Sequence, residues 1–189
     1  MNNNNKLPQA VICVSGFKNS GKTALIEALI PMLSEAGIRT AVIKHHGHGF
    51  GDEIPDKPGT DTYRFLRTGA FGTAIYDECM FALVKRREAT LEELIALFPD
   101  ADLILAEGEK EAALPRIVML RKGQPFVFGR GAGPESSKPG PASPLLCAVT
   151  DPDYDLSVLP EGLPRFDFGD FEPVAALIRK YIADRILRP

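Results

Sequence analysis

The chain has 189 residues, of which 44% are hydrophobic and 25% charged, and its formal net charge is −3. These values are typical of one globular domain, and the charge gives no reason to expect nucleic acid as a partner. No apolar run reaches the ~18 residues that a membrane helix needs, and the N-terminus lacks the apolar core of a secretory signal. We therefore expect a cytoplasmic protein that neither spans nor binds a membrane.

We expect residues 1–8 to be a disordered polar tail and residues 9–189 to form a single nucleotide-binding domain. Residues 129–144 are rich in Gly, Pro and Ser, which predicts an exposed, flexible connector. Cys13, Cys79 and Cys147 each lie in an apolar run without CxxC spacing. They are predicted to be buried, reduced thiols in strands.

Short β-branched runs alternate with segments of helical periodicity along the chain. Helices are predicted from Lys22 to a stop at Gly37, with a kink at Pro31, and at 60–70, 90–99 and 171–187. Thr90 and Glu93 have the spacing of a capping box. Strands are predicted at 9–15, 38–45, 71–77, 79–86, 101–108, 115–122 and, as the last one, 145–151. The first two strands and the helix between them predict a right-handed βαβ unit.

The stretch "GFKNSGKT" (Gly16–Thr23) matches GxxxxGK[ST], and it follows a predicted buried strand and opens a helix. The glycines let the backbone wrap around phosphates, and the helix N-terminus adds a positive dipole end. Lys22 would reach the β- and γ-phosphates, and Thr23 would offer its hydroxyl to Mg²⁺. The predicted phosphate-binding residues are Gly16, Phe17, Lys18, Asn19, Ser20, Gly21, Lys22, Thr23 and Ala24.

A second acidic partner for Mg²⁺ is expected at the end of another buried strand. Glu107 follows the apolar run "LILA" and lies at its carboxyl end, where α/β sheets bind ligands. We predict that Glu107 holds the metal together with Thr23 and acts with Lys22 in catalysis, while Gly108 lets the backbone pass close to the nucleotide. Asp102 falls at the opposite edge of the sheet and is expected to be structural.

All three histidines, His45, His46 and His48, lie at the carboxyl end of the second predicted strand or directly after it. The spacing leaves three interpretations open, namely a transition-metal site, contact with the nucleotide or a second substrate, and a solvated polar loop. Together the strands and helices predict an α/β protein of the P-loop NTPase type, with three layers, a mostly parallel central sheet and a β-rich insert.

Four motifs occur in order, namely the phosphate loop, "VIKHHGHGF", "DKPGTDTYRFLRTGA" and "DLILAEGEK". Over residues 10–121 the chain thereby resembles the small GTP-binding adaptor proteins of molybdopterin-guanine dinucleotide biosynthesis, the B-protein family of that pathway. The resemblance implies a P-loop homodimer that binds GTP and hydrolyses it slowly. It also implies a partnership with the guanylyltransferase that attaches GMP to molybdopterin, with the molybdopterin cofactor as a further candidate ligand.

In that family two further segments lie near the nucleotide. In this sequence they hold Lys44, His45, His46 and His48, and Pro58, Gly59, Asp61, Thr62 and Arg64. The chain departs from the family pattern at Thr60, where a lysine is frequent, and at Glu109, where an aromatic residue is usual, but it retains Lys110. A phosphate contact from position 60 is therefore expected to be lost or moved, and Glu109 is expected to change the charge and the packing near the site.

The choice of guanine has little support from the residues themselves, because the chain has no Asn-Lys-x-Asp motif. Asp151 follows a predicted strand and could read guanine, or it could be a turn or cap residue. No strong base or arginine finger is evident, with Arg64 and Arg67 as candidates only, which predicts slow turnover. The alternatives are a metal-delivery GTPase that uses the histidines and a small-molecule kinase.

Overall fold

The computed structural model describes residues 9–47, 49–50, 53–109, 112–126 and 143–186. The expected N-terminal tail, most of the predicted connector (129–142), His48 and Lys110 lie outside the described residues. The chain divides into two compact units, one made of residues 1–45 and 95–189 and the other of residues 46–94. We call them the sheet unit and the hairpin unit and describe each by itself. A single domain over 9–189 stays a prediction.

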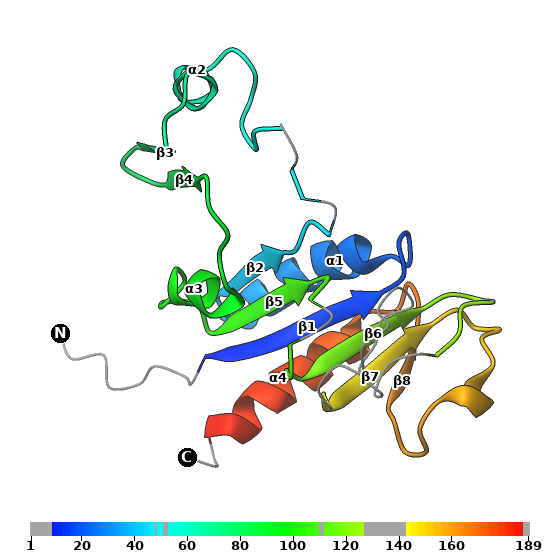
Figure 1. Cartoon of the computed structure of the whole chain (residues 1–189). Coiled ribbons are helices and arrows are strands. Elements are labelled where there is room, and N and C mark those ends of the chain that lie inside the picture. The colour runs from blue at the N-terminus through cyan, green and yellow to red at the C-terminus, as the bar shows by residue number, and fades with distance from the viewer. Residues whose placement is uncertain (1–8, 48, 51–52, 110–111, 127–142, 187–189) are drawn as a thin grey trace. The chain divides into compact units, whose positions relative to one another are not determined.

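The sheet unit is built on a six-stranded sheet with the order β2-β5-β1-β6-β7-β8 (Figure 1). Every pairing in this sheet is parallel, so the carboxyl ends of the strands meet at one edge. The strands are β1 (Ala10–Gly16), β2 (Thr40–Lys44), β5 (Leu103–Glu107), β6 (Arg116–Leu120), β7 (Leu145–Thr150) and β8 (Arg165–Asp167). The predicted α/β class with a parallel central sheet is confirmed.

Two helices cover one face of this sheet, α1 (Lys22–Glu35) and α4 (Glu172–Ile186), and they contact each other. Leu25, Leu29 and Leu33 on α1 are fully buried, as are Val174 and Ile178 on α4. Burying a side chain of this size contributes about 1.5–3 kcal/mol. Over β6 and β7 the opposite face carries a smaller apolar cluster, which includes residues of the loops after these strands.

Helix α1 ends as the sequence predicts. Gly37 has a φ of 76°, and Ile38 donates its N–H to the carbonyl of Leu33 at 3.0 Å, which closes the last turn. Pro31 lies within the helix on an exposed position and does not end it. A proline removes one backbone hydrogen bond of the helix. The predicted kink stays a prediction.

The sequence analysis did not predict the order of the strands or the last strand, β8. β1 and β2 lie in the same parallel sheet, but β5 is inserted between them. The prediction that residues 145–151 form the last strand is wrong, because β8 follows and pairs with β7. With three residues, β8 is too short to show a strand periodicity in the sequence.

The hairpin unit contains α2 (Asp61–Arg67) and the antiparallel pair β3 (Gly72–Tyr76) and β4 (Phe81–Lys85), as predicted. The carboxylate of Asp77 closes the turn by accepting the N–H groups of Cys79 at 2.7 Å and Met80 at 2.8 Å. These hydrogen bonds hold the pKa of Asp77 below its ordinary value.

The helix α3 (Leu91–Ala96) begins with the predicted capping box. The N–H of Thr90 donates to the carboxylate of Glu93 at 3.1 Å, and the N–H of Glu93 donates to the Thr90 hydroxyl at 3.2 Å. In the described part of the chain, no helix combines the length and apolar character that crossing a bilayer requires.

The cysteines differ in their surroundings. Cys13 and Cys147 are buried in β1 and β7, but Cys79 is exposed in the turn of the hairpin. The prediction of buried thiols is therefore wrong for Cys79, because the tip of a two-stranded hairpin has no layer to cover it. Burial raises the pKa of the Cys13 thiol above its ordinary value and that of Cys147 to about 12.

We therefore expect the folded protein to show one rapidly reacting thiol when it is titrated with an aromatic disulfide near pH 8. A thiolate is the reactive form, and the buried thiols are both inaccessible and held protonated. Cys79→Ser should remove the fast phase, and denaturant should release two further thiols in either protein. Two fast thiols in the folded protein would contradict this assignment.

Candidate nucleotide-binding site

The phosphate loop (Gly16–Thr23) joins the end of β1 to the start of α1. Asn19 has a φ of 61° and Gly21 a φ of 91°, so two nearby residues adopt the left-handed conformation. Alternation of right- and left-handed residues turns successive N–H groups toward one point, which forms a cradle for an anion. The loop thus has the backbone geometry that phosphate binding needs.

Close neighbours explain both glycines of the loop. A Cβ atom on Gly16 would lie 2.4 Å from the Ser20 hydroxyl and 2.7 Å from the carbonyl oxygen of Met119 on β6. A Cβ on Gly21 would lie 2.4 Å from the ring of Phe168. A side chain at position 16 would clash with the backbone of β6. At position 21 it would clash with the Phe168 ring, and the φ of 91° also disfavours any residue but glycine.

The charges at the loop favour an anion. The first turn of α1 contains no acidic side chain, so nothing there offsets the positive end of the helix dipole. The Nζ atom of Lys22 donates to the carbonyl oxygens of Gly16 at 3.2 Å and Phe17 at 2.8 Å. These contacts hold the ammonium group over the loop, where a bound phosphate would meet it.

Glu107 lies beside the loop, at the carboxyl end of β5. It is opposite Val14 of β1 and Lys44 of β2 in the strand register, and only 7% of its surface is exposed. Its Oε1 atom accepts from the Thr23 hydroxyl at 3.4 Å and lies 3.3 Å from Nζ of Lys44. The hydroxyl and the carboxylate therefore face each other, as the sequence predicts for a magnesium site.

These residues surround one cavity of about 400 Å³. It is lined by Lys18, Asn19, Gly21, Lys22, Thr23, Lys44 and Glu107. Three of the lining side chains are cationic and one is anionic, which suits a polyphosphate. The cavity lies at the carboxyl edge of the parallel sheet, where folds of this class bind their ligands.

The family model for molybdopterin guanine dinucleotide synthesis protein B, or MobB, matches residues 11–129. The chain belongs to the MobB family. The predicted family resemblance is confirmed by this match, which includes the phosphate loop and Glu107.

Relatives and solved structures agree with this assignment. A probable molybdopterin-guanine dinucleotide biosynthesis adapter protein of Bacillus subtilis is 40% identical over 115 residues, which are 60% of this chain and 66% of that protein. The adapter protein of Escherichia coli is 34% identical over 119 residues, with the same coverage of 60% and 66%. The match therefore spans just under two thirds of these relatives.

A crystal structure of Bacillus subtilis MobB superposes with a TM-score of 0.65 and 29% identity, over 94% of this chain and 98% of that chain. A structure described as molybdopterin-guanine biosynthesis protein B has the same TM-score at 24% identity, and it supports the fold alone. The six-stranded parallel sheet with a small antiparallel hairpin is thus a MobB-like fold.

Of the other residues considered in the sequence analysis, His45 and Gly108 lie beside Glu107, whereas Asp102 lies at the opposite edge of the sheet. His45 is exposed, and its N–H extends the β2–β5 pairing by donating to the Glu107 carbonyl at 2.9 Å. A Cβ on Gly108, whose φ is 85°, would lie 3.3 Å from the carbonyl oxygen of His45. Asp102 lies at the opposite end of β5 and binds Arg39 through three hydrogen bonds of 2.9–3.0 Å. Its predicted structural role is confirmed.

The remaining residues predicted for the site are Asp61 and Asp151, and Asp151 does not line the cavity at the phosphate loop. Asp61 lies in the hairpin unit with Arg64 and Arg67, and it forms an exposed ion pair with Arg64 at 3.4 Å. The part of these three residues in nucleotide binding stays a prediction. Asp151 follows β7 in the sheet unit and accepts the N–H of Lys122 at 2.8 Å.

His45 and His46, the two histidines that the structure describes, are not part of a metal site among the described residues. The Nδ1 atom of His46 lies 2.8 Å from the carbonyl oxygen of Gly49, and its ring stacks on Phe50 with 5.2 Å between centroids. Among the described residues, no group of three His, Cys, Asp or Glu side chains could hold a metal ion. His48 lies outside the described residues, so the role of the histidines stays open.

Sequence reasoning missed a buried arginine next to the site. Arg116 on β6 is 4% exposed and donates to the Ser15 hydroxyl, to the Glu109 carbonyl at 2.6 Å and to the Ala112 carbonyl at 2.9 Å. Burial lowers the pKa of Arg116 below its ordinary value. The guanidinium thus ties the segment after Glu107 to β1. A single arginine before an apolar run carries no sequence signal of burial.

We expect Arg116→Met to lower the free energy of unfolding by about 3 kcal/mol, measured by urea denaturation. The substitution leaves the buried Ser15 hydroxyl and the part-buried carbonyls of Glu109 and Ala112 without their donor, and each such loss costs up to about 1–3 kcal/mol. Arg179→Met is the matched control, because that arginine is 33% exposed and pairs with Glu172 at the surface. The control should lose no more than about 1 kcal/mol. Equal losses in both variants would contradict a special role for Arg116.

Proposed function

We propose that the protein is a GTP-binding adapter with slow GTPase activity that assists the guanylation of molybdopterin. The single observation that carries the proposal is the convergence of Lys22, Thr23 and Glu107 on one cavity at the phosphate loop. Membership of the MobB family supports the pathway, because the relatives named above are described as adapter proteins of molybdopterin-guanine dinucleotide biosynthesis. The choice of guanine rests on that family membership.

The residues present fit Mg²⁺ as the cofactor of the nucleotide. Mg²⁺ prefers oxygen ligands and keeps several waters, so few protein ligands suffice. The Thr23 hydroxyl and the Glu107 carboxylate, 3.4 Å apart, provide such oxygens. When bound, the ion would offset charge on the β- and γ-phosphates. Lys44, at 3.3 Å from Glu107, positions the carboxylate from the side of β2.

The chain's own groups would act mainly by holding the triphosphate. The loop amides and the N-terminus of α1 would bind its oxygens, and Lys22 would stabilise the charge that develops on the transferred phosphoryl group. Among the described residues that line the cavity, Glu107 is the only carboxylate, and it is already shared by Thr23 and Lys44. A site with strong binding groups and no dedicated base among these lining residues would hydrolyse GTP slowly.

The partner we propose is the guanylyltransferase that attaches GMP to molybdopterin, with molybdopterin itself as a further candidate ligand. An adapter acts through other proteins, so surfaces outside the nucleotide site must carry recognition. Metal delivery through the histidines and phosphoryl transfer to a small metabolite are the alternatives. The described ranges contain no cluster of three metal ligands that would favour metal delivery.

Lys22→Ala should weaken GTP binding by roughly 10–100-fold, because charge-assisted hydrogen bonds are worth about 1.5–3 kcal/mol. Isothermal titration calorimetry with GTP and Mg²⁺ measures the effect. Lys180→Ala removes an exposed lysine of α4 and should bind GTP like the unchanged protein. Equal affinity of the Lys22→Ala and unchanged proteins would contradict the proposed site, as would the absence of any GTP binding.

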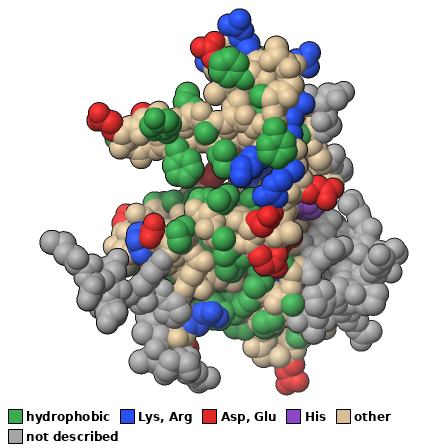
Figure 2. Space-filling model, turned by 60° about the vertical axis from the view of Figure 1, so that its left-hand side comes forward, with side chains coloured by type: hydrophobic (Ala, Val, Ile, Leu, Met, Phe, Trp, Pro, Cys, Tyr) green, Lys and Arg blue, Asp and Glu red, His purple; other side chains and the backbone are tan. Residues whose placement is uncertain are grey.

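We further propose that the hairpin unit pairs with a second copy of the chain in a homodimer. Its strands and the turn between them expose large apolar side chains, including Ile75 (60%), Tyr76 (83%), Met80 (72%) and Phe81 (73%), and Figure 2 shows hydrophobic groups at the surface. A two-stranded sheet alone is at best marginally stable in water, and exposed apolar surface of this kind marks an interaction site.

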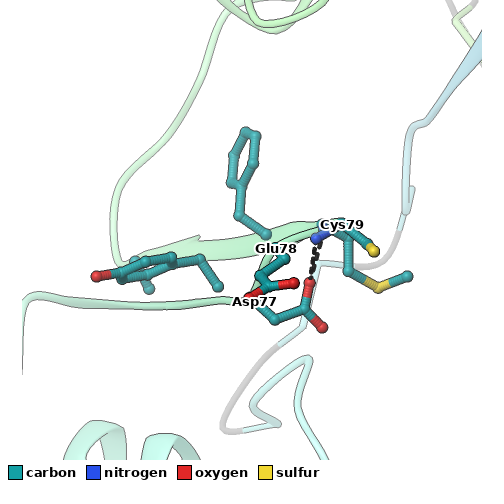
Figure 3. A pocket seen from close by; sticks show the side chains of 7 residues that line it. Asp77, Glu78 and Cys79 are labelled. Atoms are coloured by element: carbon teal, nitrogen blue, oxygen red, sulfur yellow. Dashed lines mark hydrogen bonds between the residues drawn. The ribbon is translucent and has the colours of Figure 1, made fainter.

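The turn of the hairpin forms one wall of a hollow that an apolar group could fill. This pocket of about 540 Å³ is lined by Ala74, Tyr76, Asp77, Glu78, Cys79, Met80 and Phe81. Figure 3 shows it from close by, with the hydrogen bond from Cys79 to Asp77. Insertion of a side chain from a second copy would bury part of this surface.

Phe81→Glu should therefore shift the protein toward the monomer, because a charge would have to be buried in the dimer interface. Sedimentation equilibrium at several concentrations would show the change in mass. Val158→Glu is the matched control, since Val158 is 47% exposed in the sheet unit. A monomeric mass for the unchanged protein would contradict the dimer, and so would an unchanged dimer in Phe81→Glu.

A further inference from the structure

A cluster of three side chains lies where β6, β7 and β8 end, on the sheet unit. The guanidinium of Arg121 stacks on the ring of Phe168, with 3.8 Å from its Cζ atom to the ring centroid. Its Nη1 atom lies 3.1 Å from Oδ1 of Asp151, which is an ion pair without the alignment of a hydrogen bond. The N–H of Phe168 donates to the carbonyl of Thr150 at 2.7 Å, which fixes the start of the segment after β8.

This cluster touches the phosphate loop directly. The ring of Phe168 packs against Gly21 so closely that a Cβ there would lie 2.4 Å from it. The same ring carries Arg121 on its face and meets Phe171 edge-on at 5.4 Å between centroids. One aromatic ring therefore separates the guanidinium of Arg121 from the backbone that would bind phosphate.

The strand order indicates the direction in which a bound nucleotide would extend from the phosphate loop across the edge of the sheet. Glu107, the proposed ligand of the Mg²⁺ at the β- and γ-phosphates, and Lys44 beside it lie on β5 and β2, to one side of β1. Strands β6, β7 and β8 lie on the other side of β1. A triphosphate whose terminal group points toward Glu107 must therefore extend its nucleoside toward the cluster of Arg121, Asp151 and Phe168.

From this placement, and given the proposed nucleotide site, we propose that Arg121 forms the seat of the purine base. A guanidinium plane is a stacking surface for nucleobases, and 32% of the Arg121 side chain is exposed. Phe168 supports the guanidinium from beneath, and the base stacks on the opposite side. The ligand class is a purine nucleoside phosphate, held at one end by the loop and at the other by Arg121.

Asp151 acquires a different role in this arrangement. Its Oδ2 atom accepts the N–H of Lys122 at 2.8 Å, and Oδ1 lies against Arg121. Both carboxylate oxygens therefore hold the turn that carries Arg121. Asp151 is a positioning residue for the stacking surface, and its effect on the base is exerted through Arg121.

The test compares GTP with inorganic tripolyphosphate, which has the phosphates but no base. Calorimetric titrations with Mg²⁺ are carried out on the unchanged protein, Arg121→Ala, Arg121→Lys and Arg179→Ala. Arg121→Ala should weaken GTP binding by about 5–100-fold, as expected for the loss of one stacking contact, and leave tripolyphosphate binding unchanged. Arg121→Lys, which keeps the charge but loses the plane, should behave in the same way. Arg179→Ala should bind both ligands normally.

The outcomes separate this proposal from the one on which it rests. If the unchanged protein binds neither ligand, the nucleotide site itself is wrong. If it binds both but Arg121→Ala binds GTP normally, the base seat is wrong while the phosphate site stands. Equal weakening of GTP and tripolyphosphate would show that Arg121 acts on the loop, which also overturns the base seat. Retained tripolyphosphate binding shows that the variant is folded.

Discussion

The close contact of the phosphate loop with the strands beside it is the constraint on which the site depends. At Gly16 the loop leaves no room beside the carbonyl of Met119, and at Gly21 it leaves none beside Phe168. These contacts, with the left-handed residues Asn19 and Gly21, fix the backbone before any ligand arrives. A preorganised cradle avoids most of the ordering cost of binding, so its amides can act on phosphate with nearly their full strength.

The charges around the loop follow from the same arrangement. Lys22 is held by loop carbonyls, and Lys44 is held by Glu107. Both lysines therefore have partners within the chain, and these partners are weaker than a polyphosphate would be. A bound polyphosphate would thus compete with the loop carbonyls and with Glu107 for these two ammonium groups.

The parts that the sequence predicted are those encoded within a few residues. The loop motif, the capping box of Thr90 and Glu93, and Glu107 at the end of an apolar run each combine a local signal with a known structural context. Features that arise from distant segments were missed. The contact of Phe168 with Gly21 joins residues far apart in the chain, and β8 is too short for a pattern. In the sequence Arg116 resembles an ordinary surface charge, but the fold buries it. Cys79 lies in an apolar run that predicts a buried thiol, but it is exposed in the turn of the hairpin.

Glu107 shows how local and distant determinants combine at the site. Its strand places it at the carboxyl edge between Val14 and Lys44. The next residues leave the sheet at Gly108, and Arg116 then binds the carbonyls of Glu109 and Ala112 from the neighbouring side of β1. The carboxylate is therefore held from the strand before it and from the segment after it. A carboxylate held at both ends keeps its oxygens aimed at Thr23, because neither the strand nor the segment can shift without breaking hydrogen bonds to the sheet or to the buried Arg116.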